Sequence, residues 1–316
     1  QIRTLISSFS DLETFFRHYW NSKYSFASND RIYKSFKDAL KSQKIGDARQ
    51  FLLELNVASE LYRKIGEPLE SDWKIQKEKA IYQSLLLLNQ YKVLQVRPFL
   101  LAVLAVHKKG LISQTTLINT IVNLENFHFI FSNLCQDRAS GLEGKYTRAA
   151  KNLYLAGNSK FKVLEELKGL MDYLKQKRPS DSKIESAVSE LLFSKKRDAQ
   201  KRTIQTIFRK IENFLLKTKE LSIATFSLEH IEDQSSAAPW IGSIGNLLPL
   251  DEDLNNQIKA KSTFQQKCNV YRKSQFNIVK QFVSKHGSTP WNKSASEHWM
   301  VYISKTINKA TKLKSL

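Results

Sequence analysis

Apolar residues recur at helical spacing through the first two thirds of the chain. In the first such stripe, Phe15, Phe16 and Tyr19 follow Ser10 and Asp11, two residue types that cap the start of a helix. The 316 residues include 10 glycines and 6 prolines, so few residues interrupt helices. The pattern predicts further helices at residues 29–42, 46–65, 70–91, 98–108, 113–137, 146–155, 161–176, 184–193 and 198–217.

The pattern changes near residue 226. A short run of aromatic and branched residues that begins at Phe226 has the composition of a strand and contains the pair Glu229-His230. A second apolar run, residues 244–248, follows after a loop, and a polar segment with Asn255 comes next. This order predicts a strand, a loop, a second strand and a helix.

Three residues of this segment suit metal-dependent hydrolysis of a phosphodiester. Histidine has an ordinary pKa of ~6.5, so we predict that His230 is the general base that deprotonates water. Glu229 and Asn255 offer the hard oxygen ligands that Mg²⁺ prefers, and Mn²⁺ or another divalent cation is the alternative. Neighbouring residues of a strand point to opposite faces, so Glu229 and His230 are expected to straddle a scissile phosphate.

These residues belong to a longer ordered motif that resembles the C-terminal nuclease domain of GmrSD-type, modification-dependent (type IV) restriction enzymes. The hallmark of that family reads roughly Glu/Asp-His-Ile-x-Pro-Gln, then Gly-Asn-Leu-x-Leu-Leu, then Asn, then Ser-x-Phe-x-x-Lys-x-x-x-Tyr-x-x-Ser. The corresponding positions here are residues 229–234, 245–250, 255 and 262–274. The HNH domain of CRISPR effector nucleases has a similar opening and an asparagine at a comparable distance.

The resemblance implies a mainly α fold, in which a large helical domain is followed by a small ββα-metal (His-Me finger, HNH) nuclease domain. It also implies that His230 is the base and that Glu229 and Asn255 are metal ligands. One departure is that Glu232-Asp233 replaces the apolar residue and proline of the family. These two carboxylates either add metal ligands or weaken the approach of phosphate.

Other polar residues of this region are candidates for supporting roles. Asn246 is predicted to hold the loop between the strands through hydrogen bonds to backbone, with a secondary effect on catalysis. Two basic clusters either contact DNA phosphates or form a solvated surface. The first comprises Lys195, Lys196, Arg197, Lys201, Arg202, Arg209 and Lys210. The second, on the presumed nuclease helix after Asn255, comprises Lys259, Lys261, Lys267, Arg272 and Lys273.

The remaining histidines and the N-terminal aromatic residues are assigned to structure. The histidines lack acid or cysteine neighbours at ligand spacing; they are His18, His107, His128, His286 and His298. The aromatic group is expected in the core because its spacing is helical, with base stacking as the alternative; its members are Tyr19, Trp20, Tyr24 and Phe26.

The composition of the chain also bears on its binding partner and its cellular compartment. The net charge is +20, which favours a polyanionic partner, because lysine and arginine gain affinity by releasing counterions from nucleic acid. No stretch approaches the ~20 apolar residues of a membrane helix. Cys135 and Cys268 are too few for a disulfide framework or a zinc cluster, which favours the cytoplasm. The chain starts at Gln1 and has no Gly-rich phosphate loop, so the upstream nucleotide-hydrolysing domain of the resembled family would lie outside it.

The sequence therefore predicts a helical domain at residues 1–219, which contacts DNA or acts as a scaffold, and a nuclease domain at residues 220–316. The predicted function is a metal-dependent endonuclease that cuts DNA in defence against phage or other foreign DNA, modified DNA included. One site cuts one strand, so a double-strand break would need a homo-oligomer or rebinding. Two alternatives stay open: a non-catalytic nucleic-acid-binding module with a decayed site, and a ribonuclease or toxin of the same fold.

Overall fold

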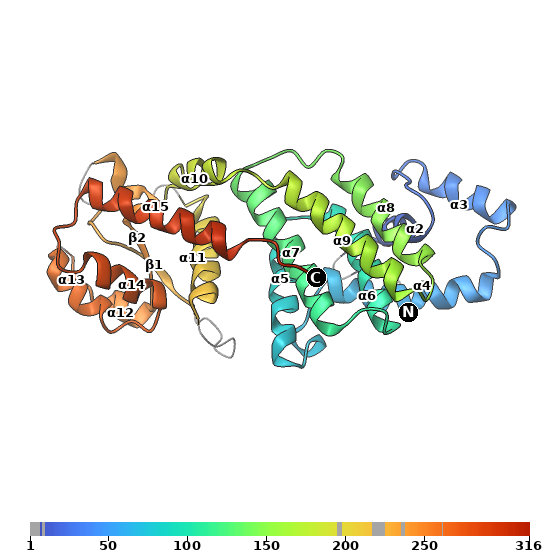
Figure 1. The fold of residues 1–316 in the computed structure, drawn as a ribbon, viewed down its shortest axis with the longest axis horizontal. Coiled ribbons are helices and arrows are strands. Elements are labelled where there is room, and N and C mark those ends of the chain that lie inside the picture. The colour runs from blue at the N-terminus through green and yellow to red at the C-terminus, as the bar shows by residue number, and fades with distance from the viewer. Residues whose placement is uncertain (1–6, 8–9, 195–197, 217–224, 235–237, 261) are drawn as a thin grey trace. The chain divides into compact units, whose positions relative to one another are not determined.

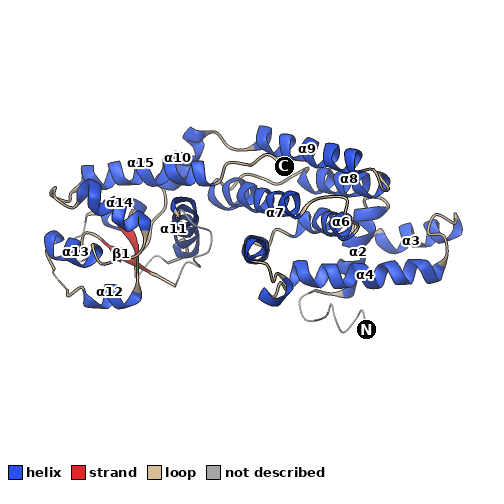
Figure 2. Ribbon diagram, turned by 60° about the horizontal axis from the view of Figure 1, so that its bottom comes forward, coloured by secondary structure: helices blue, strands red, loops and turns tan. Residues whose placement is uncertain are grey.

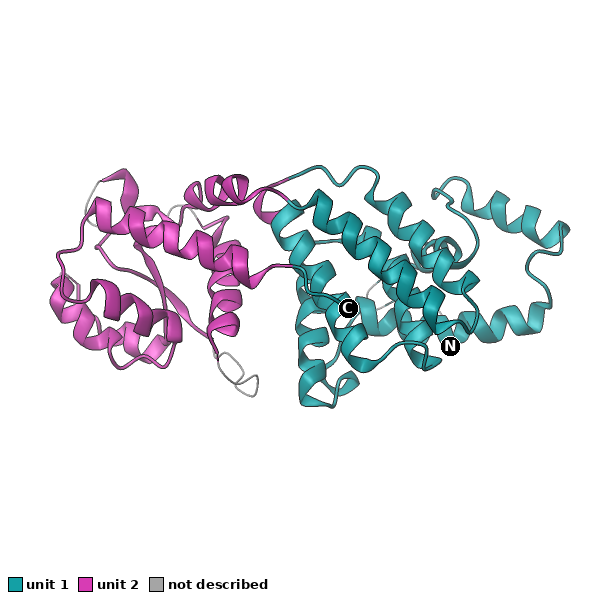
Figure 3. Ribbon diagram, viewed as in Figure 1, with its two compact units in different colours: residues 1–132, 137–178, 313–316 teal, residues 133–136, 179–312 magenta. Residues whose placement is uncertain are grey.

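The computed structural model describes residues 7, 10–194, 198–216, 225–234, 238–260 and 262–316. The chain forms two compact units (Figures 1 and 3). Unit 1 comprises residues 1–132, 137–178 and 313–316, and unit 2 comprises residues 133–136 and 179–312. Helices make up most of the described residues, and the strands form a two-stranded sheet (Figure 2). The predicted mainly α class is therefore confirmed.

The long elements described in unit 1 are helices, and α6 lies at their centre. The residues of α6 are almost all buried, from Arg97 to Val106, and the helix packs on α2, α4 and α8. Burial on all sides explains why its sequence is apolar around the whole helix. The helices are α2 (Leu12–Lys23), α3 (Ile32–Lys41), α4 (Ala48–Gly66), α5 (Lys79–Gln90), α6 (Arg97–Lys108), α7 (Gln114–His128), α8 (Leu142–Leu155) and α9 (Lys160–Lys177).

The aromatic residues near the N-terminus are mostly part of the core of unit 1. Tyr19 and Trp20 are each 2% exposed, and the Trp20 ring stacks on the Tyr24 ring with centroids 4.6 Å apart. Phe26 differs, because its side chain is exposed. The core assignment is thus confirmed for Tyr19 and Trp20 and wrong for Phe26.

One predicted helix of unit 1, at residues 70–91, is broken. α5 forms its second half, and short 3₁₀ turns at Glu70–Asp72 and Gln76–Glu78 precede it. The Asp72 carboxylate accepts a hydrogen bond from the Leu69 N–H at 3.0 Å, and the Glu78 carboxylate accepts one from the Ile75 N–H at 3.1 Å. Such bonds give the backbone an alternative to the helical ladder.

Unit 2 places helices around an antiparallel hairpin, so the predicted order of strand, loop, strand and helix is present. The strands are β1 (Ser227–His230) and β2 (Leu247–Leu250), and His230 pairs with Leu247. The loop between them includes 3₁₀ turns at Pro239–Gly242 and Ile244–Asn246. The helices are α10 (Asp181–Ser189), α11 (Lys201–Leu215), α12 (Glu252–Gln257), α13 (Phe264–Tyr271), α14 (Asn277–His286) and α15 (Lys293–Ala310).

The boundary between the units lies at residue 178 and not at the predicted residue 219. α10 and α11 both pack on α15. In addition, the buried Glu212 carboxylate of α11 accepts hydrogen bonds from the Asn277 N–H at 2.8 Å and the Ile278 N–H at 3.0 Å, which caps the start of α14. These contacts make α10 and α11 part of unit 2.

The last residues of the chain return to unit 1. The Lys314 N–H donates to Asn123 Oδ1 and the Asn123 amide donates to the Lys314 carbonyl, both at 2.8 Å. Among the helices that the structure describes, none combines the length and the apolar composition needed to cross a membrane.

Candidate active site

His230 is the last residue of β1, at the edge of the hairpin. Burial alternates along this strand: Leu228 and His230 are buried, whereas Ser227 and Glu229 are half-buried. This alternation follows from the pleat of a strand, which directs successive side chains to opposite faces. Glu229 and His230 therefore project to opposite sides of β1, and His230 retains 6% of its surface exposed.

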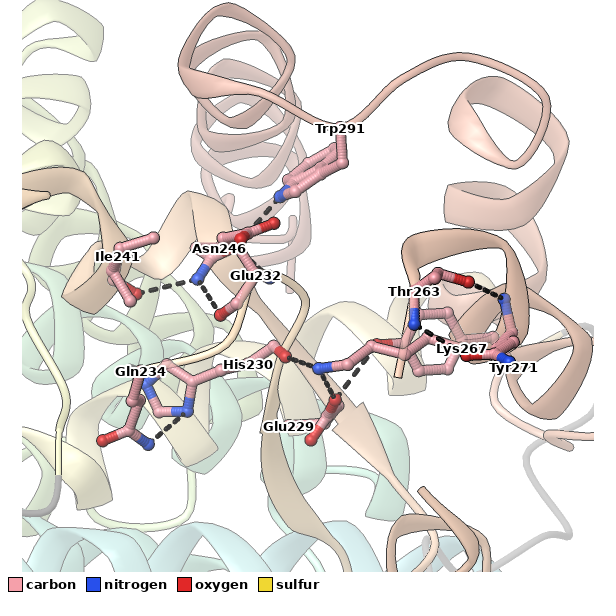
Figure 4. Close-up of polar contacts among 11 residues, drawn as sticks. Glu229, His230, Glu232, Gln234, Ile241, Asn246, Thr263, Lys267, Tyr271 and Trp291 are labelled. Carbon is pink, nitrogen blue, oxygen red and sulfur yellow. Dashed lines mark hydrogen bonds and ion pairs between the residues drawn. The ribbon is translucent and has the colours of Figure 1, made fainter. Parts of the chain in front are cut away.

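The hydrogen bonds of the His230 ring define its tautomer. Nε2 lies 3.0 Å from the Phe193 carbonyl oxygen, which only accepts, so Nε2 must carry the proton. Nδ1 then holds the lone pair, which accepts a hydrogen bond from the Gln234 side-chain amide at 2.9 Å (Figure 4). The Phe193 ring also stacks on the imidazole, with centroids 5.5 Å apart. The neutral ring is thus oriented by one backbone carbonyl, one amide and one aromatic face.

The surroundings of His230 favour its neutral form. Burial is the main cause that lowers the pKa of His230 below its ordinary value, and the Lys267 ammonium adds to the effect. The hydrogen bond to the Phe193 carbonyl and the charges of Glu229 and Asp233 oppose this shift. Because its pKa is lowered, the imidazole is neutral at neutral pH and can accept a proton.

Phe193 is a site residue that the sequence did not reveal. The predicted helix at 184–193 ends in the structure at Ser189, and the chain after it runs beside the loop of the hairpin. The Phe193 N–H donates to the Gly242 carbonyl at 2.8 Å, and Leu192 forms a β-bridge with Ser243. The Phe193 carbonyl is a backbone group, so the identity of the side chain carries no signal of the hydrogen bond to His230.

Asn246 holds the loop that follows His230, as predicted for its structural role. Its side chain is fully buried and makes four hydrogen bonds (Figure 4). Oδ1 accepts from the Glu232 N–H at 2.8 Å and from the Trp291 indole at 2.9 Å. The amide donates to the carbonyls of Glu232 at 3.1 Å and Ile241 at 2.9 Å. These four hydrogen bonds do not involve the His230 ring, so a catalytic effect of Asn246 would act through this loop.

Gly245 beside it is required by close packing. A Cβ atom at this position would collide with the Ser296 carbonyl of α15 and crowd its hydroxyl. The glycine of the motif therefore lets the loop approach α15, which helps to place the second strand.

Glu229 faces a lysine and a tyrosine from α13. The Lys267 ammonium lies 2.8 Å from Glu229 Oε1 and donates to the His230 carbonyl at 2.6 Å (Figure 4). The Tyr271 hydroxyl donates to the same Oε1 at 3.2 Å. The side chains of Lys267 and Glu229 are only 5% and 12% exposed. This differs from the expected outward position of the basic helix face, because Lys267 points into the site.

The donor set fits a divalent cation only when water and phosphate complete its shell. Asn255 lies half-buried on α12, which packs against β1, and so the two predicted ligands come from adjacent elements. Among the described residues, no group of three or more His, Cys, Asp or Glu side chains forms a metal cage. Mg²⁺ commonly binds through one or two protein oxygens together with water and substrate phosphate, so Glu229 and Asn255 suit it in that form.

The remaining basic candidates lie mainly outside α13. Lys259, Arg272 and Lys273 are exposed, Lys259 before α13 and the other two in the turn after it. Lys261 lies outside the described residues, as do Lys195, Lys196 and Arg197 of the first cluster. From that cluster, Lys201 begins α11 and places its ammonium 5.8 Å from the centre of the Phe193 ring. This contact brings one exposed lysine close to the residue that stacks on His230.

Fold and site together define a mainly helical protein whose second unit presents a tautomer-fixed histidine from the end of a β-hairpin. Residues 178–303 match the family model of the GmrSD restriction endonucleases, C-terminal domain. This segment therefore resembles the C-terminal part of GmrSD-like type IV restriction enzymes, and the resemblance noted in the sequence is confirmed. The match begins at residue 178, one residue before the long segment of unit 2 (residues 179–312) that includes α10 and α11. No curated protein matches the chain.

Proposed function

We propose that this chain is a metal-dependent endonuclease of the HNH type that hydrolyses DNA phosphodiesters, with His230 as the general base. The observation that supports the proposal most is the fixed tautomer of His230. Nε2 is committed to the Phe193 carbonyl, so the lone pair of a neutral imidazole lies on Nδ1. The family match to restriction endonucleases supports DNA as the substrate.

Gln234 would occupy the place of the attacking water in the absence of DNA. Gln234 is an exposed residue and its amide donates to Nδ1, so an attacking water would take the place of this amide when DNA binds. A water at the same place would donate to Nδ1 and lose its proton to it as it attacks phosphorus. The Phe193 carbonyl and the nearby Glu229 carboxylate would stabilise the imidazolium that results. The bond between phosphorus and the 3′ oxygen would break, and this oxygen would take a proton from solvent, so the products would carry 5′-phosphate and 3′-hydroxyl ends.

Glu229 and Asn255 would hold the divalent cation together with water and phosphate oxygens. When bound, Mg²⁺ or Mn²⁺ supplies positive charge that offsets the charge growing on the phosphate and the leaving oxygen. Lys259, Lys261, Arg272 and Lys273 would contact the backbone of DNA on either side. Asn246 would support the reaction by keeping the loop after His230 in place.

The proposed setting is defence against phage or other foreign DNA, modified DNA included, in the cytoplasm. Neither Cys135 nor Cys268 forms a disulfide, in keeping with that compartment. One site would nick one strand, and a second copy of the chain or rebinding would complete a double-strand break. Unit 1 would contact DNA or an upstream nucleotide-hydrolysing domain.

Plasmid cleavage tests the proposal. Supercoiled plasmid is incubated with the native protein, His230→Ala and His298→Ala, each with Mg²⁺, with Mn²⁺ and with EDTA. His298 is an exposed histidine of α15 and serves as the matched control. We expect nicking by the native protein and the control that stops with EDTA and with His230→Ala. Undiminished nicking by His230→Ala would reject the assigned base, and preferential cleavage of labelled RNA in a parallel digestion would reject DNA as the substrate.

A further inference from the structure

The ammonium of Lys267 is an unusual neighbour for a carboxylate that is proposed to bind a metal ion. Lysine is rarely buried unless it is paired, and Lys267 is 4% exposed. Its partners are Glu229 Oε1 and the His230 carbonyl, so the ammonium lies against both residues of the acid-histidine pair. Tyr271 contributes a further donor to the same carboxylate oxygen. Glu229 thus receives two donors from α13 before any ion arrives.

The charges of this cluster decide how strongly it attracts a free cation. Glu229 and Lys267 have opposite unit charges, and Asn255 is neutral, so these three residues have no net negative charge. A divalent ion at Glu229 would also lie close to the ammonium, and repulsion between like charges is strong at sites of low exposure. A bound phosphate would change the balance, because it adds negative charge and further oxygen ligands.

We propose that Lys267 is an internal cation that competes with the divalent ion for Glu229, so that the ion binds tightly only when DNA phosphate shares the site. This inference rests on the proposed function. It gives Lys267 a positioning role that differs from a direct contact with the DNA backbone. The ordering of metal and substrate would then be set by one buried side chain of α13.

Removal of the ammonium tests the competition directly. Mn²⁺ affinity is measured by the electron paramagnetic resonance signal of the free ion, without DNA, for the native protein, Lys267→Met and Lys280→Met. Lys280 is an exposed lysine of α14 and serves as the control. We expect Lys267→Met to bind Mn²⁺ about tenfold more tightly than the native protein, because it retains the stem of lysine without the charge. Lys280→Met should match the native protein. Equal affinity of all three would overturn the proposal.

Two further variants identify the carboxylate concerned. In Lys267→Met with Glu229→Gln the tightening should disappear, because the carboxylate freed by the first change is removed by the second. If the tightening persists in this double variant, another carboxylate binds the ion and the proposal fails. Tyr271→Phe removes a donor but leaves the ammonium, so its Mn²⁺ affinity should stay within about threefold of the native value.

A measurement on His230→Ala avoids dependence on the folding of a Lys267 variant. This protein keeps Lys267 and Glu229 but lacks the proposed base, so we expect it to bind a short DNA duplex without cutting it. We expect the duplex to tighten Mn²⁺ binding at least tenfold in His230→Ala, and equal Mn²⁺ affinity with and without DNA would overturn the coupling. These binding results do not depend on cleavage. If the native protein cleaves no DNA yet shows the expected Mn²⁺ affinities, the proposed function fails and the competition at Glu229 stands.

Discussion

Buried histidines occur in both units, but their second ring nitrogens have different partners. In unit 1, His18 contacts the Tyr62 hydroxyl through Nδ1 at 2.6 Å and the Arg17 guanidinium through Nε2 at 3.2 Å. His128 likewise contacts the Tyr146 hydroxyl at 2.8 Å. In unit 2, one ring nitrogen of His230 donates to the Phe193 carbonyl, and the other accepts a hydrogen bond from the exposed residue Gln234.

This difference separates a histidine that fills a core from one that can act on a substrate. His18 and His128 are 1% and 0% exposed, and burial lowers the pKa of each to about 3. The tyrosines that contact them, Tyr62 and Tyr146, are fully buried in the core of unit 1. The partner of His230 Nδ1, by contrast, is the side chain of an exposed residue, Gln234. Burial of the histidine alone therefore does not mark it as structural; the burial of its hydrogen-bond partners must be considered as well.

Replacement of the two kinds of histidine should give the largest contrast. We expect His230→Ala to lower the rate of DNA cleavage by ~10²–10⁴-fold, the usual contribution of a general base. His18→Ala should leave that rate nearly unchanged but lower the free energy of unfolding by about 2–3 kcal/mol, because it leaves buried partners unpaired. Single-turnover cleavage of a labelled duplex and urea unfolding measure the two effects. A loss of cleavage by a well-folded His18→Ala protein would contradict the purely structural role of His18.

Asn246→Ala should have the next largest effect, on the stability of unit 2. The change removes four hydrogen bonds within a buried loop. We expect the free energy of unfolding to fall by about 3 kcal/mol, since each buried group left without a partner costs ~1–3 kcal/mol. Asn292→Ala is the matched control: Asn292 caps α15 through a bond of 3.0 Å to the Ala295 N–H, and its loss should cost about 1 kcal/mol. Equal losses in urea unfolding would show that Asn246 does not hold the loop.

The pH dependence of stability should come mainly from the buried histidines of unit 1, although burial also lowers the pKa of His230 in unit 2. The folded pKa values of His18 and His128 are about 3, below the ordinary value of 6.5, so the unfolded chain binds more protons between these limits. Stability is therefore full above ~6.5 and is lost as the pH falls toward 3, by up to ~1.4 kcal/mol per pH unit for each histidine. Urea unfolding at pH 7, 6 and 5 measures this slope.

The variant His18→Gln with His128→Gln tests the source of that slope. Glutamine keeps hydrogen-bonding groups but does not titrate, so the loss between pH 7 and 5 should be much smaller than in the native protein. An unchanged slope would assign the acid sensitivity to other groups. The variant should cleave DNA at the native rate at pH 7, since neither residue belongs to the candidate site.

The hairpin and its histidine could be predicted because their signal is local. The order of apolar runs identifies the strands, and the pair Glu229-His230 identifies the candidate base. The structural role of Asn246 could be predicted because its side chain can form hydrogen bonds to backbone. Lys267 could not be placed in this way. In a polar helix a lysine has the appearance of a solvated residue, and only tertiary packing brings it to Glu229. The Phe193 carbonyl carries no side-chain signal at all.

The position of the domain boundary depended on contacts that the sequence does not show. Polar runs at residues 177–182 and 217–222 have similar loop character, and the composition alone favours neither as a boundary. What decides is the packing of α10 and α11 on α15, elements separated by a long stretch of chain. Long-range packing of this kind has no periodic signature.

Because residues 313–316 return to unit 1, the segment 179–312 is an insertion in the chain of unit 1. It is covalently joined to unit 1 at both of its ends, so a single proteolytic cut near residue 178 would leave it attached through Lys312. A fragment that begins at residue 179 would keep the last residues but lose Asn123, their partner. Exchange of this segment between related proteins would need two matched junctions, one at each end.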